Sequence, residues 1–181
     1  MRAVFSALSG ALLMLLVATP LPVSAQDLAI AAFYGRFQGS GVSENADSLY
    51  FGVTVRDFDV AIGPDGAGFF VEWTTVIHAG PDSTRPEVRR RTDRMVFAPS
   101  ATAKVWRTAT QGNPWGDGIA WAKLEKQTLT VSMMRVTEDG GWTVQSYART
   151  LTATGMELDF FVVRDGEAQR HVKGRLVKVA G

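Results

Sequence analysis

The side chains best suited to metal binding and to nucleophilic catalysis are scarce in this sequence. It contains two histidines, His78 and His171, and no cysteine. A zinc site would need both histidines together with carboxylates, and the metalloprotease, nucleophile-elbow and phosphate-loop motifs are absent. An acid, a base and an oriented partner cannot be assembled from what is present. We therefore expect no catalytic residue, no metal and no cofactor, and catalysis is the least favoured class of function.

Arginine is the other residue that could do chemistry, and it is concentrated between Arg85 and Arg94. In a strand, Arg89 and Arg91 point to one face. Arg90 and Arg94 then point to the opposite face. One interpretation is an inward arginine pair that binds a carboxylate or phosphate head group. The other, which we favour, is a solvated strand that resists edge-to-edge aggregation. Its arginines would pair across the outer surface with Asp57, Asp59 and Glu72.

The elements that position these side chains are predicted to be strands, because alternation with a period of two recurs between Gly, Asp and Pro turns. No stretch after the first 25 residues has a sustained helical period. Long strands joined mostly by short turns favour an all-β, antiparallel up-and-down barrel of about 8–10 strands over a sandwich. We expect a single domain over 26–181. The predicted strands are 33–42, 49–62, 68–79, 86–97, 118–125, 128–138, 142–153, 156–164 and 167–179.

The first predicted hairpin has Asp65-Gly66 at its tip, a pair favoured in two-residue turns. This register sorts apolar from polar side chains. Earlier on the second strand, Phe51, Val53 and Val55 alternate in the opposite phase, which predicts a β-bulge at Arg56-Asp57. The facing apolar pairs in this register are Phe58 with Trp73, Val60 with Val71, and Ile62 with Phe69.

The last predicted hairpin has Asp165-Gly166 as its turn and is less consistent. Its inward row comprises Met156, Leu158, Phe160 and Val162. The residues opposite would be Arg175, Lys173, His171 and Gln169. A packed core excludes such a row of charges. Either the turn is longer, or a bulge shifts the register, or the barrel has a polar, liganded interior. In the last case Tyr147 and Arg149, on the neighbouring strand, add to that interior.

One long connection interrupts the meander, from Pro99 to Asp117. Loops of this length in compact domains are often functional or disordered, and the aromatic side chains of Trp106 and Trp115 argue against disorder. We interpret it as a lid or plug over one end of the barrel. A packed surface loop or short helix without a ligand role is the alternative.

The first 25 residues have the order of parts found in a secretory signal. Arg2 precedes an apolar stretch over 3–17, and Val23-Ser24-Ala25 supplies small residues for cleavage after Ala25. The apolar stretch is short for a retained membrane anchor. We expect export to a periplasm, with no integral membrane span after cleavage. Cleavage also removes Arg2, which leaves 18 basic and 18 acidic residues. A neutral domain is not expected to bind nucleic acid.

Two short segments resemble the calycin group, the lipocalin-like barrels. Gly35 and Phe37, within Phe33–Gly39, are similar to the Gly-x-Trp opening of the first lipocalin strand, with Phe in place of Trp. Arg175 resembles the final-strand arginine that packs across that aromatic residue in lipocalins. The middle lipocalin motif and the C-terminal helix are missing. The resemblance implies a barrel that binds a small hydrophobic or amphipathic molecule inside.

The leading hypothesis is therefore an exported, carrier-type protein for a hydrophobic or amphipathic ligand. Its pocket would lie between the first hairpin and the strand over 156–162, with Trp106 or Trp115 near the mouth. The alternative is a non-catalytic envelope interaction module whose aromatic residues form a packed core; its protein partners are not indicated. The candidate ligand-binding residues are Phe58, Val71, Trp73, Trp106, Trp115, Tyr147, Arg149, Phe160 and His171.

Overall fold

A computed structural model of the chain describes residues 28–45, 54–79, 87–110 and 112–180. The predicted signal segment lies outside these ranges, so its cleavage after Ala25 stays a prediction. Among the described residues, no helix has the length and apolar character needed to cross a membrane. A short 3-10 turn, η1 (Ile30–Phe33), precedes the strands. The strands are β1 (Gly35–Asn45), β2 (Thr54–Asp65), β3 (Gly68–Ala79), β4 (Glu87–Pro99), β5 (Val105–Thr108), β6 (Ile119–Glu125), β7 (Thr128–Val136), β8 (Trp142–Leu151), β9 (Gly155–Arg164) and β10 (Glu167–Val179).

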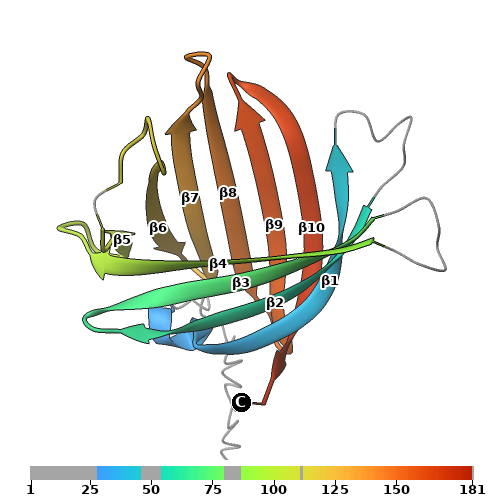
Figure 1. Ribbon diagram of the computed structural model, residues 1–181. Helices are drawn as coiled ribbons and strands as arrows, with labels where there is room; N and C mark the ends of the chain where they lie inside the picture. The colour runs from blue at the N-terminus through green and yellow to red at the C-terminus, as the bar shows by residue number, and fades with distance from the viewer. Residues whose placement is uncertain (1–27, 46–53, 80–86, 111, 181) are drawn as a thin grey trace, which may run out of the picture.

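These ten strands form one closed antiparallel barrel in which each strand pairs with its neighbours in sequence and β1 pairs with β10 (Figure 1). The predicted fold class, an up-and-down meander of about 8–10 strands, is confirmed. The strand that sequence reasoning missed is β5, which lies inside the long Pro99–Asp117 connection. The part of the predicted lid that contains β5 is therefore a short strand of the barrel wall.

The two ends of the barrel differ. The turns after β2, β4, β6 and β8 lie at one end together with η1, which we call the closed end (Figure 1). The connections after β5, β7 and β9 lie at the other, the open end. The inward side chains Phe69 and Phe97 near this end are fully buried; Phe69 stacks on Phe97 at 5.2 Å and meets the edge of Trp106 at 5.2 Å. The closed end is therefore a packed aromatic and aliphatic plug.

The first hairpin turns one residue later than predicted, at Gly66-Ala67. Gly66 has a φ of 54°, a conformation that suits glycine at the first central position of a hairpin turn. Phe58 consequently faces Thr75, and Val60 faces Trp73. Moving the turn by one residue shifts the pairing by two, so every side chain stays on its predicted face. The predicted partners were wrong and the predicted faces were right.

The bulge predicted at Arg56-Asp57 is wrong. The pairing of β2 with both β1 and β3 runs through these residues without a shift. Alternation therefore continues back along β2, with Val55 outside the barrel and 53% exposed and Arg56 inside. Phe51 and Val53, on which the prediction also rested, lie outside the described residues.

In the last hairpin, the bulge alternative is correct. The turn is Asp165-Gly166, and Ala168 faces Val163, but the next residue to pair is Arg170 with Val162. The extra residue, Gln169, shifts the rest of β10 by one position. Val172, Gly174 and Leu176 thereby face Phe160, Leu158 and Met156. The charged row of His171, Lys173 and Arg175 is turned to the outer surface.

The bulge in β10 also changes which cation contacts the aromatic ring of Phe37 at the start of the barrel. Phe37 is buried, as the lipocalin resemblance implies for an aromatic at this position. The cation over its ring is Lys178, with Nζ 5.7 Å from the ring centroid. Arg175 instead lies outside the barrel, where its Nε is 3.5 Å from Glu157. The expectation for Arg175 was therefore wrong.

The barrel wall is thinnest at β5. Strand β4 pairs with β5 only through Phe97–Pro99, so within the described chain Glu87–Met95 has no strand on that side. In Figure 1 this part of β4 crosses in front of β7 and β8. Exposed arginines, Arg89 to Arg91, occupy this edge, where charge disfavours pairing with another chain.

Candidate functional site

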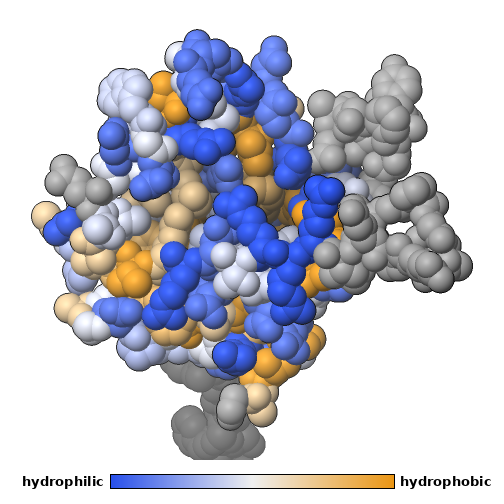
Figure 2. Space-filling view, viewed as in Figure 1, coloured by the Kyte–Doolittle hydropathy of each residue, from blue (hydrophilic) through white to orange (hydrophobic). Residues whose placement is uncertain are grey.

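The open half of the barrel encloses a cavity of about 460 Å³. This volume lies within the range of roughly 300–1,000 Å³ that is usual for small-molecule sites. Its wall is built from inward side chains of β2, β3, β4, β7, β8, β9 and β10. In Figure 2, apolar surface is visible between hydrophilic side chains above β4. The interior is thus packed at the closed end and hollow toward the open end.

An aromatic belt surrounds the middle of the cavity. Tyr147 lies between two other rings, with its centroid 5.2 Å from Trp73 and 4.4 Å from Phe160. Phe58 completes the belt from β2. Burial raises the pKa of the Tyr147 hydroxyl, so this ring is neutral at physiological pH. The belt supplies a broad apolar surface that suits a hydrocarbon or ring system.

Arg149 lies below this belt on β8, between Leu129 of β7 and Leu158 of β9. Its side chain is 1% exposed, and within the described ranges neither Nε nor Nη1 has a hydrogen-bond partner. The guanidinium carbon is 5.3 Å from the Tyr147 ring centroid and 5.7 Å from that of Trp73. Burial lowers the pKa of Arg149 to about 10, so the group remains charged at neutral pH.

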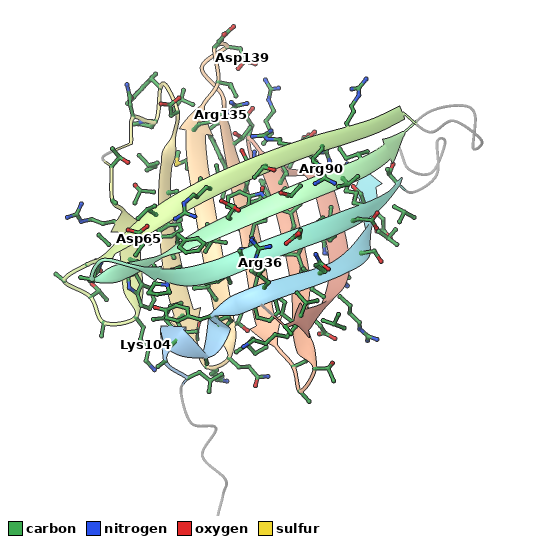
Figure 3. All side chains as sticks on the ribbon, turned by 60° about the horizontal axis from the view of Figure 1, so that its bottom comes forward. Arg36, Asp65, Arg90, Lys104, Arg135 and Asp139 are labelled. Atoms are coloured by element: carbon green, nitrogen blue, oxygen red, sulfur yellow. The ribbon has the colours of Figure 1, made fainter. Side chains whose placement is uncertain are left out.

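The cavity carries an excess of positive charge. Five arginines line it, Arg56, Arg91, Arg135, Arg149 and Arg170, against two aspartates, Asp93 and Asp117. Asp93 is engaged by Arg91, whose Nε is 2.9 Å from the carboxylate. Burial and the nearby charge of Arg170 lower the pKa of Arg56. Arg135 lies toward the open end, near the turn that contains Asp139, while Lys104 lies at the closed end (Figure 3).

A larger surface depression of about 710 Å³ lies outside the barrel. One of its two arginines, Arg94, already contacts Asp65 at 3.4 Å and Glu72 at 3.5 Å, and stacks on Phe70. The predicted outer-surface pairing of an arginine with Glu72 is therefore present. Since Arg94 is engaged by these two carboxylates and the depression lies on the outer surface, it is a weaker candidate site than the cavity.

The structure brings five of the nine predicted site residues together around the cavity: Phe58, Trp73, Tyr147, Arg149 and Phe160. Val71 points inward but is fully buried in the core below. Trp106 packs on Phe69 at the closed end, which contradicts its predicted place near the mouth. Trp115 is 76% exposed and does not line the cavity.

His171 is the clearest correction among the predicted residues. The bulge at Gln169 places it on the outer surface, where Nε2 is 2.6 Å from Asp159 and the ring stacks on Phe161 at 4.2 Å. It was expected inside because the uninterrupted register put it opposite Phe160. The side chain of His78, like residue Arg85, lies outside the described part of the chain.

Sequence reasoning missed several charged residues of the cavity. Arg135 continues the inward alternation of Leu129, Val131 and Met133, so the sequence pattern could have predicted that it points into the barrel. The inward orientation of Arg170 could not have been predicted in this way, because Arg170 points inward only as a result of the bulge. Arg91 faces the cavity, as the less favoured interpretation of the arginine-rich strand required. Asp117, at the end of the predicted lid, also lines the cavity.

A closed antiparallel meander barrel with an internal cavity is the architecture of the calycin group, and the chain resembles that group in fold. No protein-family model and no curated protein matches the sequence. Among solved structures, the chain is similar to an S-type phycobiliprotein lyase from Guillardia theta, with a TM-score of 0.40 and 8% sequence identity. The alignment covers 84% of this chain and 91% of the lyase chain.

Proposed function

We propose that this protein binds one small hydrophobic or amphipathic molecule inside the open half of its barrel and acts as a carrier. The observation that supports this most directly is the cavity of about 460 Å³ with its belt of Phe58, Trp73, Tyr147 and Phe160. A purely structural module would gain stability by filling this volume, because unfilled apolar space is destabilising.

The predicted signal segment supports the second part of the proposal. If the chain is exported and cleaved after Ala25, the barrel resides in an aqueous compartment where an apolar molecule needs a binding protein to cross. The barrel would cover the hydrocarbon part of such a molecule with its aromatic belt. The open end and the thin wall beside β5 provide the ways in.

The test compares two neighbouring methionines on β7. Met133 lines the cavity, whereas Met134 points outward on the same strand. Met133→Trp should fill the cavity and abolish both the binding of dodecan-1-ol, followed by isothermal titration calorimetry, and any lipid that co-purifies, followed by native mass spectrometry. Met134→Trp should leave both unchanged. Binding that survives in a folded Met133→Trp variant, or no binding by the wild-type protein, would overturn the proposal.

A further inference from the structure

We propose that the ligand carries a carboxylate and binds with that group deepest, on the guanidinium of Arg149, with its apolar chain rising through the aromatic belt. This inference rests on the proposed function, since it names the ligand class and the orientation in the same cavity.

The first argument is the unmet bonding capacity of Arg149. Its Nε and Nη1 are buried without a hydrogen-bond partner, and within the described residues no carboxylate pairs with it. Asp93, which also lines the cavity, is held by Arg91. A buried charge without a partner is destabilising, and proteins usually pair such groups. An anionic ligand would provide the missing partner.

The second argument is the match of shape and charge. The guanidinium edge formed by Nε and an Nη atom is planar and forks toward an acceptor with two oxygens in a plane, which a carboxylate provides. Among the described residues that line the cavity, Arg149 is the one fully buried cation; it pairs with Leu158 on β9 and lies against the rings of Trp73 and Tyr147. A monoanion would neutralise it, whereas a phosphate dianion would leave a buried negative charge uncompensated.

The third argument concerns the rings around the guanidinium. Trp73 and Tyr147 lie over Arg149, and Nε and Nη1 each expose less than 1 Å². A carboxylate that reaches these donors must turn at least one ring aside. Ligand binding should therefore change the fluorescence of Trp73, and Trp73→Phe should remove that change.

The opposite orientation would place the head group at the open end, near Arg56 and Arg170. The side chain of Arg170 is exposed and that of Arg56 is only partly buried, so both are less completely shielded from water than Arg149, although Nε of Arg56 is also buried without a hydrogen-bond partner among the described residues. Their excess charge suits attraction of an anion toward the mouth, while the dry environment of Arg149 suits its final binding.

The experiment uses three probes with the same chain: dodecanoate, dodecan-1-ol and dodecyl phosphate. The wild-type protein should bind dodecanoate roughly 10- to 100-fold more tightly than dodecan-1-ol, as expected for charge-assisted hydrogen bonds. Arg149→Met should remove this preference, so that the variant binds dodecanoate no more tightly than dodecan-1-ol. Arg149→Lys should restore it in part, because lysine keeps the charge without the planar fork. Arg94→Met, on the outer surface, is the control and should change neither affinity.

The outcomes separate the two proposals. If neither dodecanoate nor dodecan-1-ol binds, the proposed function fails. If dodecan-1-ol binds and the preference for dodecanoate is absent, or survives in Arg149→Met, the carboxylate assignment fails and the proposed function stands. Tighter binding of dodecyl phosphate than of dodecanoate also contradicts the assignment. If Arg149→Met does not fold, the same comparison is made with Arg149→Lys, whose unchanged preference would overturn the inference.

Discussion

The inward side chains of the barrel strands differ between the closed half and the open half. Toward the closed end, the inward positions carry Phe69, Phe97, Leu129 and Met156, all of them essentially inaccessible to solvent. Toward the open end, the same strands present Arg91, Arg135 and Gln145 to a cavity. The contrast indicates that stability is concentrated in one half, and that the other half keeps polar and charged side chains available to a ligand.

The boundary between the halves lies at Arg149. Below it the side chains pack against one another, and above it the aromatic belt and an excess of arginines over aspartates border an open cavity. Removing side chains below this boundary should therefore mainly lower stability, and removing side chains above it should mainly affect ligand binding.

The largest effect is expected from the closed end. Phe69→Ala removes a ring that stacks on Phe97 and meets Trp106, and it should cost about 3–5 kcal/mol of unfolding free energy. Phe160→Ala, in the cavity wall, should cost roughly half as much, because its ring already borders empty space. Urea denaturation followed by circular dichroism measures both. Equal losses would contradict the division into a packed and a hollow half.

The next effect concerns the boundary itself and has the opposite sign. Arg149→Met replaces an unpartnered buried guanidinium with an apolar side chain of similar length, so the unliganded protein should become more stable by about 1–3 kcal/mol. Thermal and urea unfolding of delipidated protein provide the measurement. A clear loss of stability would mean that Arg149 has a favourable partner in the unliganded barrel.

The smallest effect is expected at the open end. Neutralising two exposed cavity arginines, with Arg91→Gln and Arg135→Gln together, should change stability by no more than about 1 kcal/mol, because exposed ion pairs contribute little. It should slow the association of dodecanoate on the order of 3- to 10-fold and weaken the salt dependence of that rate. Stopped-flow fluorescence follows the rate. A changed dissociation rate with an unchanged association rate would instead assign these arginines to the bound state.

The barrel and its faces were predictable because both depend on local patterns. Alternation with a period of two survives an error in the turn, as the first hairpin shows: Phe58 and Trp73 point inward under either register. The short strand β5 was missed because Val105–Thr108 is too brief to show alternation and lies in a segment rich in turn-forming residues.

The cavity was predictable only in part. Arg149 was placed inside by its position on a strand beside the last hairpin, but the absence of a partner is a property of the assembled interior. Trp106 and Trp115 were grouped by proximity in sequence, whereas the structure puts Trp106 in the plug and Trp115 in solvent. His171 was misplaced because a single unpaired residue between the turn and the strand reverses the alternation.

That unpaired residue, Gln169, has a consequence for how the chain tolerates changes of length. Alternate residues of 171–179 point to opposite faces of the barrel, and the pairing register decides which set points inward. In the observed register the inward set is Val172, Gly174 and Leu176; in a register shifted by one residue it would be His171, Lys173 and Arg175. Deleting one residue near position 169 would exchange the two sets without altering any side chain. In β10, therefore, the number of residues matters more to the fold than the identity of any one of them.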